Sequence, residues 1–375
     1  MNGHMAPRRA TAGPEVSSPR RRRHSRSFSC HSPILLVTLL LALLLAGALA
    51  IGGCGSDTTG ATESETADTT APVATTAASV ETREVPAETS TSTEAAPAQE
   101  AFPVTVTDDN GTTVTISAKP ERIVSTAPAN TETLFALGVG DRVVGVTSLD
   151  DYPPEVAEIT KIGDYQANTE AIMGLSPDLV VGYSGNEEAL APVAAAGAAV
   201  LILNPMTLDG VYANIATIGA ATGVNDEAVA LAESLGATIA DIATTAEATG
   251  ESPKVFYALD NTLWTCGPGS FVDELLTLAH CTNVAAAPGA DGAAAQAYYQ
   301  FTPEQLVAAD PDVVLLPGST YAGADEFTGD PRFTGLKAVV DGNVFVIDDV
   351  IVTRPGPRIA DGLKILAEAI HPGAY

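Results

Sequence analysis

A repeated pattern constrains the fold of this 375-residue chain more than any other feature. The segments 168–181 and 302–315 both carry a Glu at their third position, Glu170 and Glu304, and both place Pro-Asp before an apolar run. Each copy predicts a short helix, a stop at Pro-Asp and a buried strand. Helix–Pro-Asp–strand is a common pattern, so coincidence is the alternative. The match of Glu and Pro-Asp at one spacing favours two related lobes with a cleft between them.

Short apolar runs alternate with helical stretches in both halves of the chain. Strands are expected at 122–125, 143–146, 179–182, 200–203, 255–259, 313–316 and 344–347, and helices at 130–137, 187–196, 208–222 and 359–370. Nearly continuous apolar strands separated by helices indicate parallel sheets covered on both faces. The alternating stretch 104–116, centred on Asp109-Asn110-Gly111, predicts a β-hairpin before the first lobe. The expected fold class is α/β, with two Rossmann-like lobes.

One long helix is expected between the lobes, because residues 225–249 contain no proline and no strand-like run. The apolar residues recur near helical spacing, at Val229, Leu231, Leu235, Ile239 and Ile242. Such a helix would reach about 37 Å at ~1.5 Å per residue. We therefore expect an N-terminal lobe over 102–224, a linking helix over 225–250 and a C-terminal lobe over 251–375.

The segment 1–54 has the layout of an export signal. A basic stretch, 20–26, precedes the apolar run 34–51, and Ile-Gly-Gly-Cys at 51–54 resembles a lipobox whose Cys54 is acylated. An uncleaved membrane anchor is the alternative, and a twin-arginine export route stays open. The segment 55–101 is mostly Thr, Ala, Ser, Glu, Gly and Pro, which predicts a disordered tether.

Charge and missing motifs exclude several functions. The chain has 18 Lys and Arg against 46 Asp and Glu, so it repels nucleic acid phosphates. Gly-x-Ser-x-Gly, Walker and zinc signatures are missing, and His280 and His371 stand alone. No catalytic residue, metal ligand or cofactor is assigned. A cleft enzyme and a ligand-binding sensor domain remain as alternatives.

Several motifs in order along 102–372 resemble one family. They are KPERIV (119–124), STAPANTE (125–132), VGV (144–146), DYPP (151–154), LSPDLV (175–180), GSFVDELL (269–276), PDVV (311–314) and RPGPR (354–358). The chain resembles the helix-linked substrate-binding proteins of ABC importers, which serve cobalamin, ferric siderophores and haem. The resemblance implies a monomeric lipoprotein on the outer face of the cell membrane. It would hand a metal chelate to an ABC permease and its ATPase. Cobalamin or another corrinoid is favoured, although Leu149 stands where cobalamin binders often carry an aromatic residue.

The resemblance also assigns the two matched glutamates, Glu170 and Glu304, to docking on arginines of the permease. Two separated anionic points would fix one register on a basic surface. The alternative is that each carboxylate complements a helix N-terminus, worth ~0.3–1 kcal/mol.

Aromatic side chains just beyond strand ends are the candidates for the cleft walls, because open α/β sheets bind ligands there. Packing in the core is the alternative for each of them. Arg354, in a loop before the last helix, is a candidate for a polar group of the ligand. The candidate ligand-binding residues are Tyr165, Tyr183, Trp264, Tyr298, Tyr299 and Arg354.

Cys266 and Cys281 remain after export, and an oxidising compartment favours a disulfide between them. Closing that loop would add roughly 3 kcal/mol to stability by the entropy model. Two unpaired small residues are the alternative.

Overall fold

The structure is a computed structural model that describes residues 102–286 and 296–375. The predicted export signal, the acylated Cys54 and the tether over 55–101 lie outside the described residues. In the described part, no helix is both long and apolar enough to cross a membrane.

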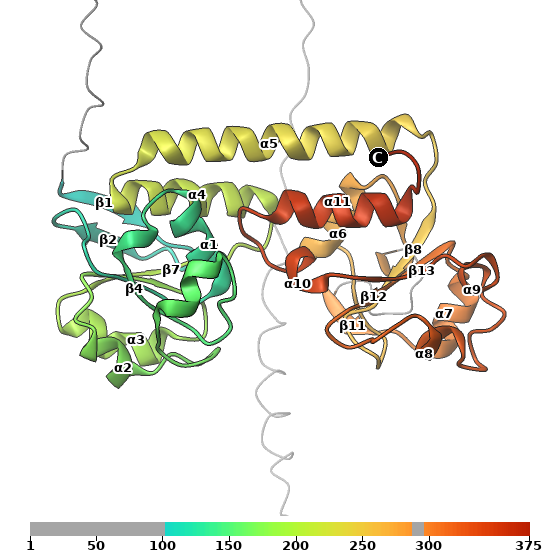
Figure 1. Cartoon of the computed structure of the whole chain (residues 1–375), viewed down its shortest axis with the longest axis horizontal. Helices are drawn as coiled ribbons and strands as arrows, with labels where there is room; N and C mark the ends of the chain where they lie inside the picture. Colours follow the sequence, from blue (N-terminus) through green and yellow to red (C-terminus); the bar gives the residue numbers. More distant parts are fainter. Residues whose placement is uncertain (1–101, 287–295) are drawn as a thin grey trace, which may run out of the picture. The chain divides into compact units, whose positions relative to one another are not determined.

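The N-terminal lobe is a five-stranded parallel sheet in the order β5-β4-β3-β6-β7, preceded by an antiparallel hairpin (Figure 1). The hairpin strands are β1 (Val104–Thr107) and β2 (Thr113–Ile116). The sheet strands are β3 (Ile123–Ser125), β4 (Val143–Val146), β5 (Thr160–Lys161), β6 (Leu179–Gly182) and β7 (Ala199–Ile202). The helices are α1 (Pro128–Ala136), η1 (Gly140–Arg142), η2 (Pro154–Glu158), α2 (Thr169–Gly174), α3 (Glu187–Ala195) and α4 (Leu208–Thr222).

The C-terminal lobe has a four-stranded parallel sheet in the order β10-β8-β12-β13. Its strands are β8 (Lys254–Tyr257), β10 (Thr282–Asn283), β12 (Val313–Pro317) and β13 (Val344–Ile347). An antiparallel pair, β9 (Trp264–Cys266) and β11 (Tyr298–Gln300), was not expected from the sequence. The helices are α6 (Phe271–Leu278), η3 (Val284–Ala286), α7 (Pro303–Ala309), α8 (Asp325–Thr328), α9 (Lys337–Asp341), α10 (Asp349–Val352) and α11 (Ile359–Ile370).

The repeat in the sequence is a repeat in the structure. The Asn168 side chain accepts a hydrogen bond from the third residue of α2, and the Thr302 side chain accepts the equivalent bond in α7. After each helix one residue has a left-handed backbone, Ser176 at φ 48° and Asp310 at φ 43°, and these two residues occupy matching positions of the two copies. The chain then turns into β6 in one lobe and β12 in the other.

The aspartate of each Pro-Asp pair holds the neighbouring strand in place. Asp178 accepts a hydrogen bond from the Arg122 amide (3.0 Å), and Asp312 accepts one from the Lys254 amide (2.8 Å). The side chains of Arg122 and Lys254 then donate to carbonyls at the C-terminal ends of α2 and α7, at 2.9 and 2.7 Å. The same geometry in both lobes explains why Pro-Asp recurs at one spacing.

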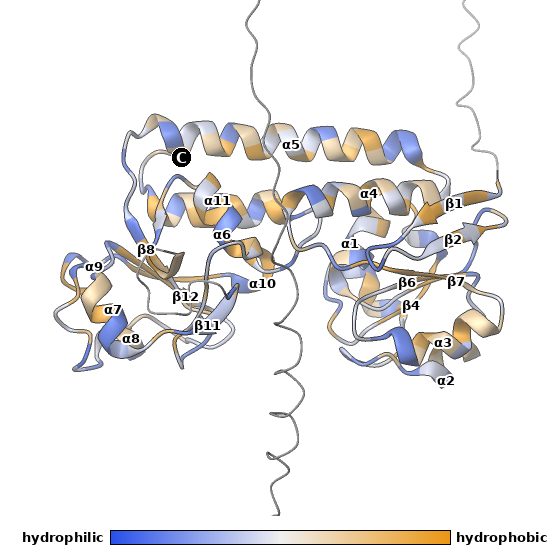
Figure 2. Ribbon diagram, turned by 180° about the vertical axis from the view of Figure 1, so that it is seen from behind, coloured by the Kyte–Doolittle hydropathy of each residue, from blue (hydrophilic) through white to orange (hydrophobic). Residues whose placement is uncertain are grey.

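The long helix α5 (Asn225–Ala248) joins the lobes, as predicted. Both α4 and α11 pack along it, so each lobe contributes a helix to the same layer (Figure 1). Apolar residues run along α4 and α11, whereas α5 alternates between polar and apolar residues (Figure 2).

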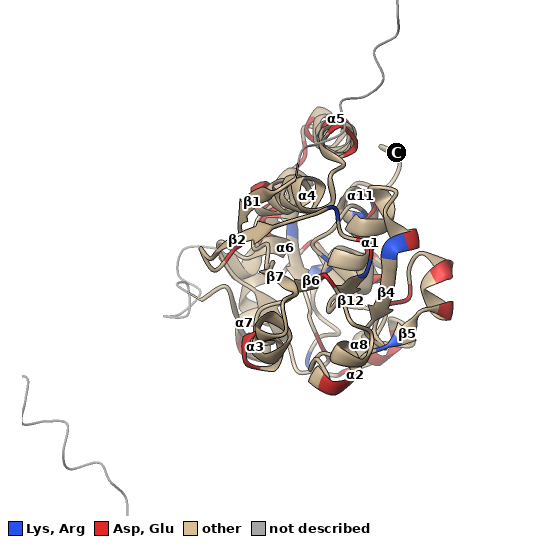
Figure 3. Cartoon of the chain, turned by 90° about the vertical axis from the view of Figure 1, so that its left-hand side faces the viewer, with Lys and Arg blue, Asp and Glu red and all other residues tan. Residues whose placement is uncertain are grey.

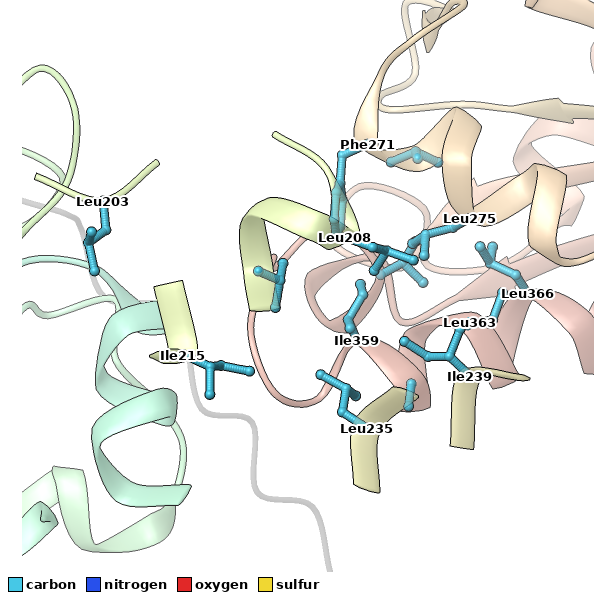
Figure 4. Close-up of a cluster of buried hydrophobic side chains, with 14 of the residues drawn as sticks. Leu203, Leu208, Ile215, Leu235, Ile239, Phe271, Leu275, Ile359, Leu363 and Leu366 are labelled. Atoms are coloured by element: carbon cyan, nitrogen blue, oxygen red, sulfur yellow. The ribbon is translucent and has the colours of Figure 1, made fainter. Parts of the chain in front are cut away.

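One hydrophobic cluster runs from lobe to lobe and includes residues of α5 (Figure 4). Leu235 and Ile239 of α5 belong to it together with Leu363 of α11 and Leu208 of α4. The amide of Leu208 also donates to the carboxylate of Glu274 on α6, at 2.9 Å. The lobes therefore share a core and a polar contact in addition to the linking helix.

A candidate ligand-binding pocket between the lobes

A pocket of about 290 Å³ has walls from both lobes. The N-terminal lobe supplies the turn between β3 and α1 and three side chains from later loops, and the C-terminal lobe supplies α10 and the segment after it. The lining residues are Thr126, Ala127, Pro128, Ala129, Leu149, Tyr165, Tyr183, Val350, Thr353, Arg354 and Pro355. The loops after β3 and β6 lie at the carboxyl edge of the sheet, where open α/β sheets bind ligands.

Tyr183 is held in the wall by the strand ends around it. Its amide donates to the Thr126 hydroxyl (3.0 Å), and Asn130 donates to the carbonyl of Gly182 (3.0 Å). Burial raises the pKa of Tyr183, so its phenol stays protonated near neutral pH. The pKa of Tyr298 is raised by burial, by Cys266 and by Tyr183.

Arg354 forms ion pairs with two carboxylates of the opposite lobe. Its Nη1 lies 2.7 Å from Oε1 of Glu132 on α1 and 2.6 Å from Oδ1 of Asp151. Burial of the guanidinium lowers the pKa of Arg354, but hydrogen bonds to Asp151 and Glu132 raise it overall. Burial raises the pKa of Asp151, but its hydrogen bond to Arg354 and the charge of Arg354 lower it overall. Both groups are therefore charged at neutral pH.

Arg358 binds the same glutamate from the next turn of the chain. Its Nη2 and Nε donate to the two oxygens of Glu132, at 2.6 and 3.0 Å, and its guanidinium carbon lies 4.0 Å from the centroid of the Tyr152 ring. The Glu132 residue is only 2% exposed. A buried carboxylate is tolerated because two guanidinium groups satisfy both of its oxygens.

The backbones of the two lobes meet beside these ion pairs. A Cβ at position 356 would lie 3.3 Å from both the Cα and the carbonyl oxygen of Ala129. Gly356 therefore lets the segment between Arg354 and Arg358 lie directly on α1.

The structure brings three of the six predicted ligand-binding residues, Tyr165, Tyr183 and Arg354, onto the pocket wall. Tyr165 is 70% exposed. Tyr298 and Trp264 are exposed on the β9–β11 pair but do not line this pocket in the described part of the chain. Their ligand contact stays a prediction.

Tyr299 is in the core, so its assignment to the ligand site was wrong. It is 5% exposed, and its hydroxyl donates to the Ala285 carbonyl at 2.7 Å. Successive residues of a strand point to opposite faces, so β11 can expose Tyr298 only while burying its neighbour.

The expected disulfide is also not present, since Cys266 and Cys281 are both free thiols. The Cys281 thiol donates to the carbonyl of Leu276 at 3.2 Å, and Cys266 is fully buried. Burial raises the pKa of the Cys281 thiol to about 12 and that of Cys266 further. Both thiols are therefore protonated and poorly reactive in the folded protein.

Glu170 and Glu304 are exposed in the first turns of α2 and α7. Figure 3, in which the N-terminal lobe faces the viewer, shows acidic residues on α2, α3 and α5. Docking of the two glutamates on a permease stays a prediction.

Sequence reasoning missed Glu132 and Asp151 as part of the site. The sequence did contain a signal for Glu132. It is the only charged residue in the stretch 123–140, and it lies on the side of the predicted helix that faces the protein interior. Arg358 pairs with the same glutamate, which lies far from it in the sequence. Among the described residues, no group of three or more His, Cys, Asp or Glu side chains could hold a metal ion.

Two lobes, one linking helix and a pocket between them define a two-lobed binding protein. The chain belongs to the periplasmic binding protein family, whose model matches residues 123–351. It is 35% identical over 285 residues to an ABC transporter substrate-binding lipoprotein of Bacillus subtilis, covering 74% of this chain and 88% of the relative. It is 31% identical to a cobalamin-binding protein of Halobacterium salinarum, covering 72% of this chain and 74% of the relative.

The chain is also similar to a solved structure. It is the periplasmic heme-binding protein RhuT of Roseiflexus sp. RS-1 in its apo form, with a TM-score of 0.60 and 30% identity. The match covers 68% of this chain and 99% of the solved chain.

Proposed function

We propose that this chain is the substrate-binding component of an ABC importer that captures a metal chelate outside the cytoplasm. The observation that carries the proposal is the interlobe pocket, whose wall combines tyrosine rings with Leu149 and Val350. Aromatic and aliphatic walls suit a broad, largely apolar ligand such as a corrin or another flat chelate. The similarity to the substrate-binding lipoprotein of Bacillus subtilis supports delivery to an ABC permease and a binding rather than a catalytic role.

A corrinoid is our first choice of ligand. The relative in Halobacterium is a cobalamin-binding protein, and it matches along most of this chain. Haem is the second candidate, favoured by the likeness to the heme-binding protein of Roseiflexus and by the Tyr183 phenol, since tyrosine oxygen is a known haem ligand. A ferric siderophore is the remaining alternative.

Export and anchoring complete the proposal. The apolar run 34–51 and Cys54 would place a lipid-anchored monomer on the outer face of the cell membrane, with 55–101 as its tether. The lipoprotein relative in Bacillus supports this location.

Binding is tested by titrating the protein with cyanocobalamin, haemin and a ferric hydroxamate, with the fluorescence of Trp264 as the signal. We expect saturable quenching at one-to-one stoichiometry with at least one of them. A protein that binds none of the three contradicts the proposal.

Docking is tested by the double variant Glu170→Arg and Glu304→Arg. We expect uptake of the chelate to be abolished while its affinity for the free protein is unchanged, because both side chains are exposed and away from the pocket. The matched control is Glu188→Arg, which changes an exposed glutamate on α3. Unchanged uptake in the double variant contradicts the docking role.

A further inference from the structure

The charge of the pocket wall depends on one side chain. Among residues 102–286 and 296–375, Arg354 is the only charged residue that lines the pocket. The other polar side chains on the wall are threonines and tyrosines, which carry hydroxyl groups. An incoming anion would therefore have to be recognised by Arg354.

Arg354 is already neutralised by the opposite lobe. Two guanidinium groups, of Arg354 and Arg358, face two carboxylates, of Glu132 and Asp151, so the cluster carries no net charge. The Glu132 carboxylate is buried, and both of its oxygens accept hydrogen bonds. If Arg354 bound a ligand carboxylate instead, the buried Glu132 would lose one of its two cationic partners, which would cost binding free energy.

The surroundings of the pocket are acidic. The adjoining smaller pocket is lined by Asp151 and Asp348 as well as by Arg358. The whole chain has a formal net charge of −28, and its outer helices display carboxylates (Figure 3). A negatively charged ligand thus meets a repulsive field and, within the described pocket wall, finds no cation that is free of a carboxylate partner.

From this arrangement we propose that the pocket selects metal chelates without net negative charge, rimmed by amides or other uncharged groups, over chelates that carry carboxylates or catecholate charge. This inference rests on the proposed function and deepens it by naming the charge class of the ligand. It favours an uncharged corrinoid or a ferric hydroxamate over haem, which carries two carboxylates.

The test uses pairs of ligands that differ only in charge. The full chain is titrated with cyanocobalamin and with its monocarboxylic acid, in which one peripheral amide is hydrolysed, and with haemin and its dimethyl ester. For each pair that binds, we expect the uncharged ligand to bind at least about ten-fold more tightly than the acid. This is the effect expected when a buried charged group is left without a partner. If the acid binds as tightly as the uncharged ligand or more tightly, this inference is overturned but the proposed function is not. Failure of all four ligands and of the ferric hydroxamate to bind refutes the proposed function, and this inference with it.

A variant then tests whether Arg354 is the cause. Asp151→Asn removes one compensating charge and leaves the buried pair with Glu132 in place. We expect the preference for the uncharged ligand to fall about three-fold, the scale of an exposed ion pair. The control Glu188→Gln removes an exposed carboxylate of α3 that does not line the pocket, and it should leave the preference unchanged. An unchanged preference in Asp151→Asn, or an equal fall in the control, overturns the role given to Arg354.

Discussion

In the N-terminal lobe α2 starts beneath an Asn168 cap, and in the C-terminal lobe α7 starts beneath a Thr302 cap. Both helices are followed by a left-handed residue and pass through Pro-Asp into a buried strand. In each lobe the aspartate binds an amide at the start of the neighbouring strand. The contacts beside the pocket are not repeated in this way. One lobe brings the carboxylates of Glu132 and Asp151, and the other brings two arginines.

This comparison shows that the contacts that build each lobe and the contacts beside the pocket have different requirements. Hydrogen bonds within each lobe need the same residues twice, so they appear as a repeat. Ion pairs between the lobes need opposite charges, so the partners on the two sides must differ. The most informative experiments compare the effect of removing a contact between the lobes with the effect of removing a contact within a lobe.

The largest effect is expected from Glu132→Ala, which breaks the charge complementarity. Removal would leave Arg354 and Arg358 partly buried without their shared partner, and we expect the free energy of unfolding to fall by roughly 3–5 kcal/mol. Urea denaturation followed by circular dichroism measures the change. The control is Glu170→Ala on exposed α2, with a change within about 0.5 kcal/mol. A loss below about 1 kcal/mol in Glu132→Ala, the range of an exposed ion pair, would mean that the cluster does not hold the lobes together.

An intermediate effect is expected when the repeated framework is weakened at matched positions. Ile172 and Leu306 are equivalent in the two copies of the repeat, and both are fully buried. Truncation of either to alanine should cost about 2–5 kcal/mol, because each leaves a cavity in a packed core. Urea denaturation of the two single variants measures both costs. Costs that differ by more than two-fold would show that the lobes are not equivalent in packing.

The smallest effect is expected at the matched left-handed residues. Ser176→Gly should stabilise the protein by about 1 kcal/mol, because glycine adopts a positive φ without steric cost. In Asp310→Gly the same relief is offset by the lost hydrogen bond from the Lys337 amide, 2.8 Å long, so we expect almost no change. Thermal unfolding of both variants checks the difference. Equal shifts in melting temperature would contradict this account.

The framework could be predicted from sequence because its signals are local. Pro-Asp, short apolar runs and a long uninterrupted helical stretch each specify a structure within a few positions. The seven expected parallel strands and α5 are confirmed at nearly the expected residues, whereas the two-residue parallel strands β5 and β10 were not expected. The short antiparallel pair of β9 and β11 escaped prediction because such short strands carry too little pattern.

The site could be predicted only in part because its contacts are long-range. Arg354 and Glu132 are 222 residues apart, and no local pattern joins them. Tyr299 was misplaced because the alternation of a strand too short to recognise decides which of two neighbouring tyrosines is buried. The cysteines were misjudged because compartment and count say nothing about where two thiols point.

The close approach of Gly356 to Ala129 has a consequence for how the protein would exchange its cargo. If the lobes move, this contact would act as a pivot, because neither glycine nor alanine has a flexible side chain that could give way. Rocking about that point would move Pro355, the sequence neighbour of Gly356, less than the exposed Tyr165 on the opposite lobe. The part of the ligand near Pro355 would then be recognised closely, whereas substituents of the ligand near Tyr165 could vary.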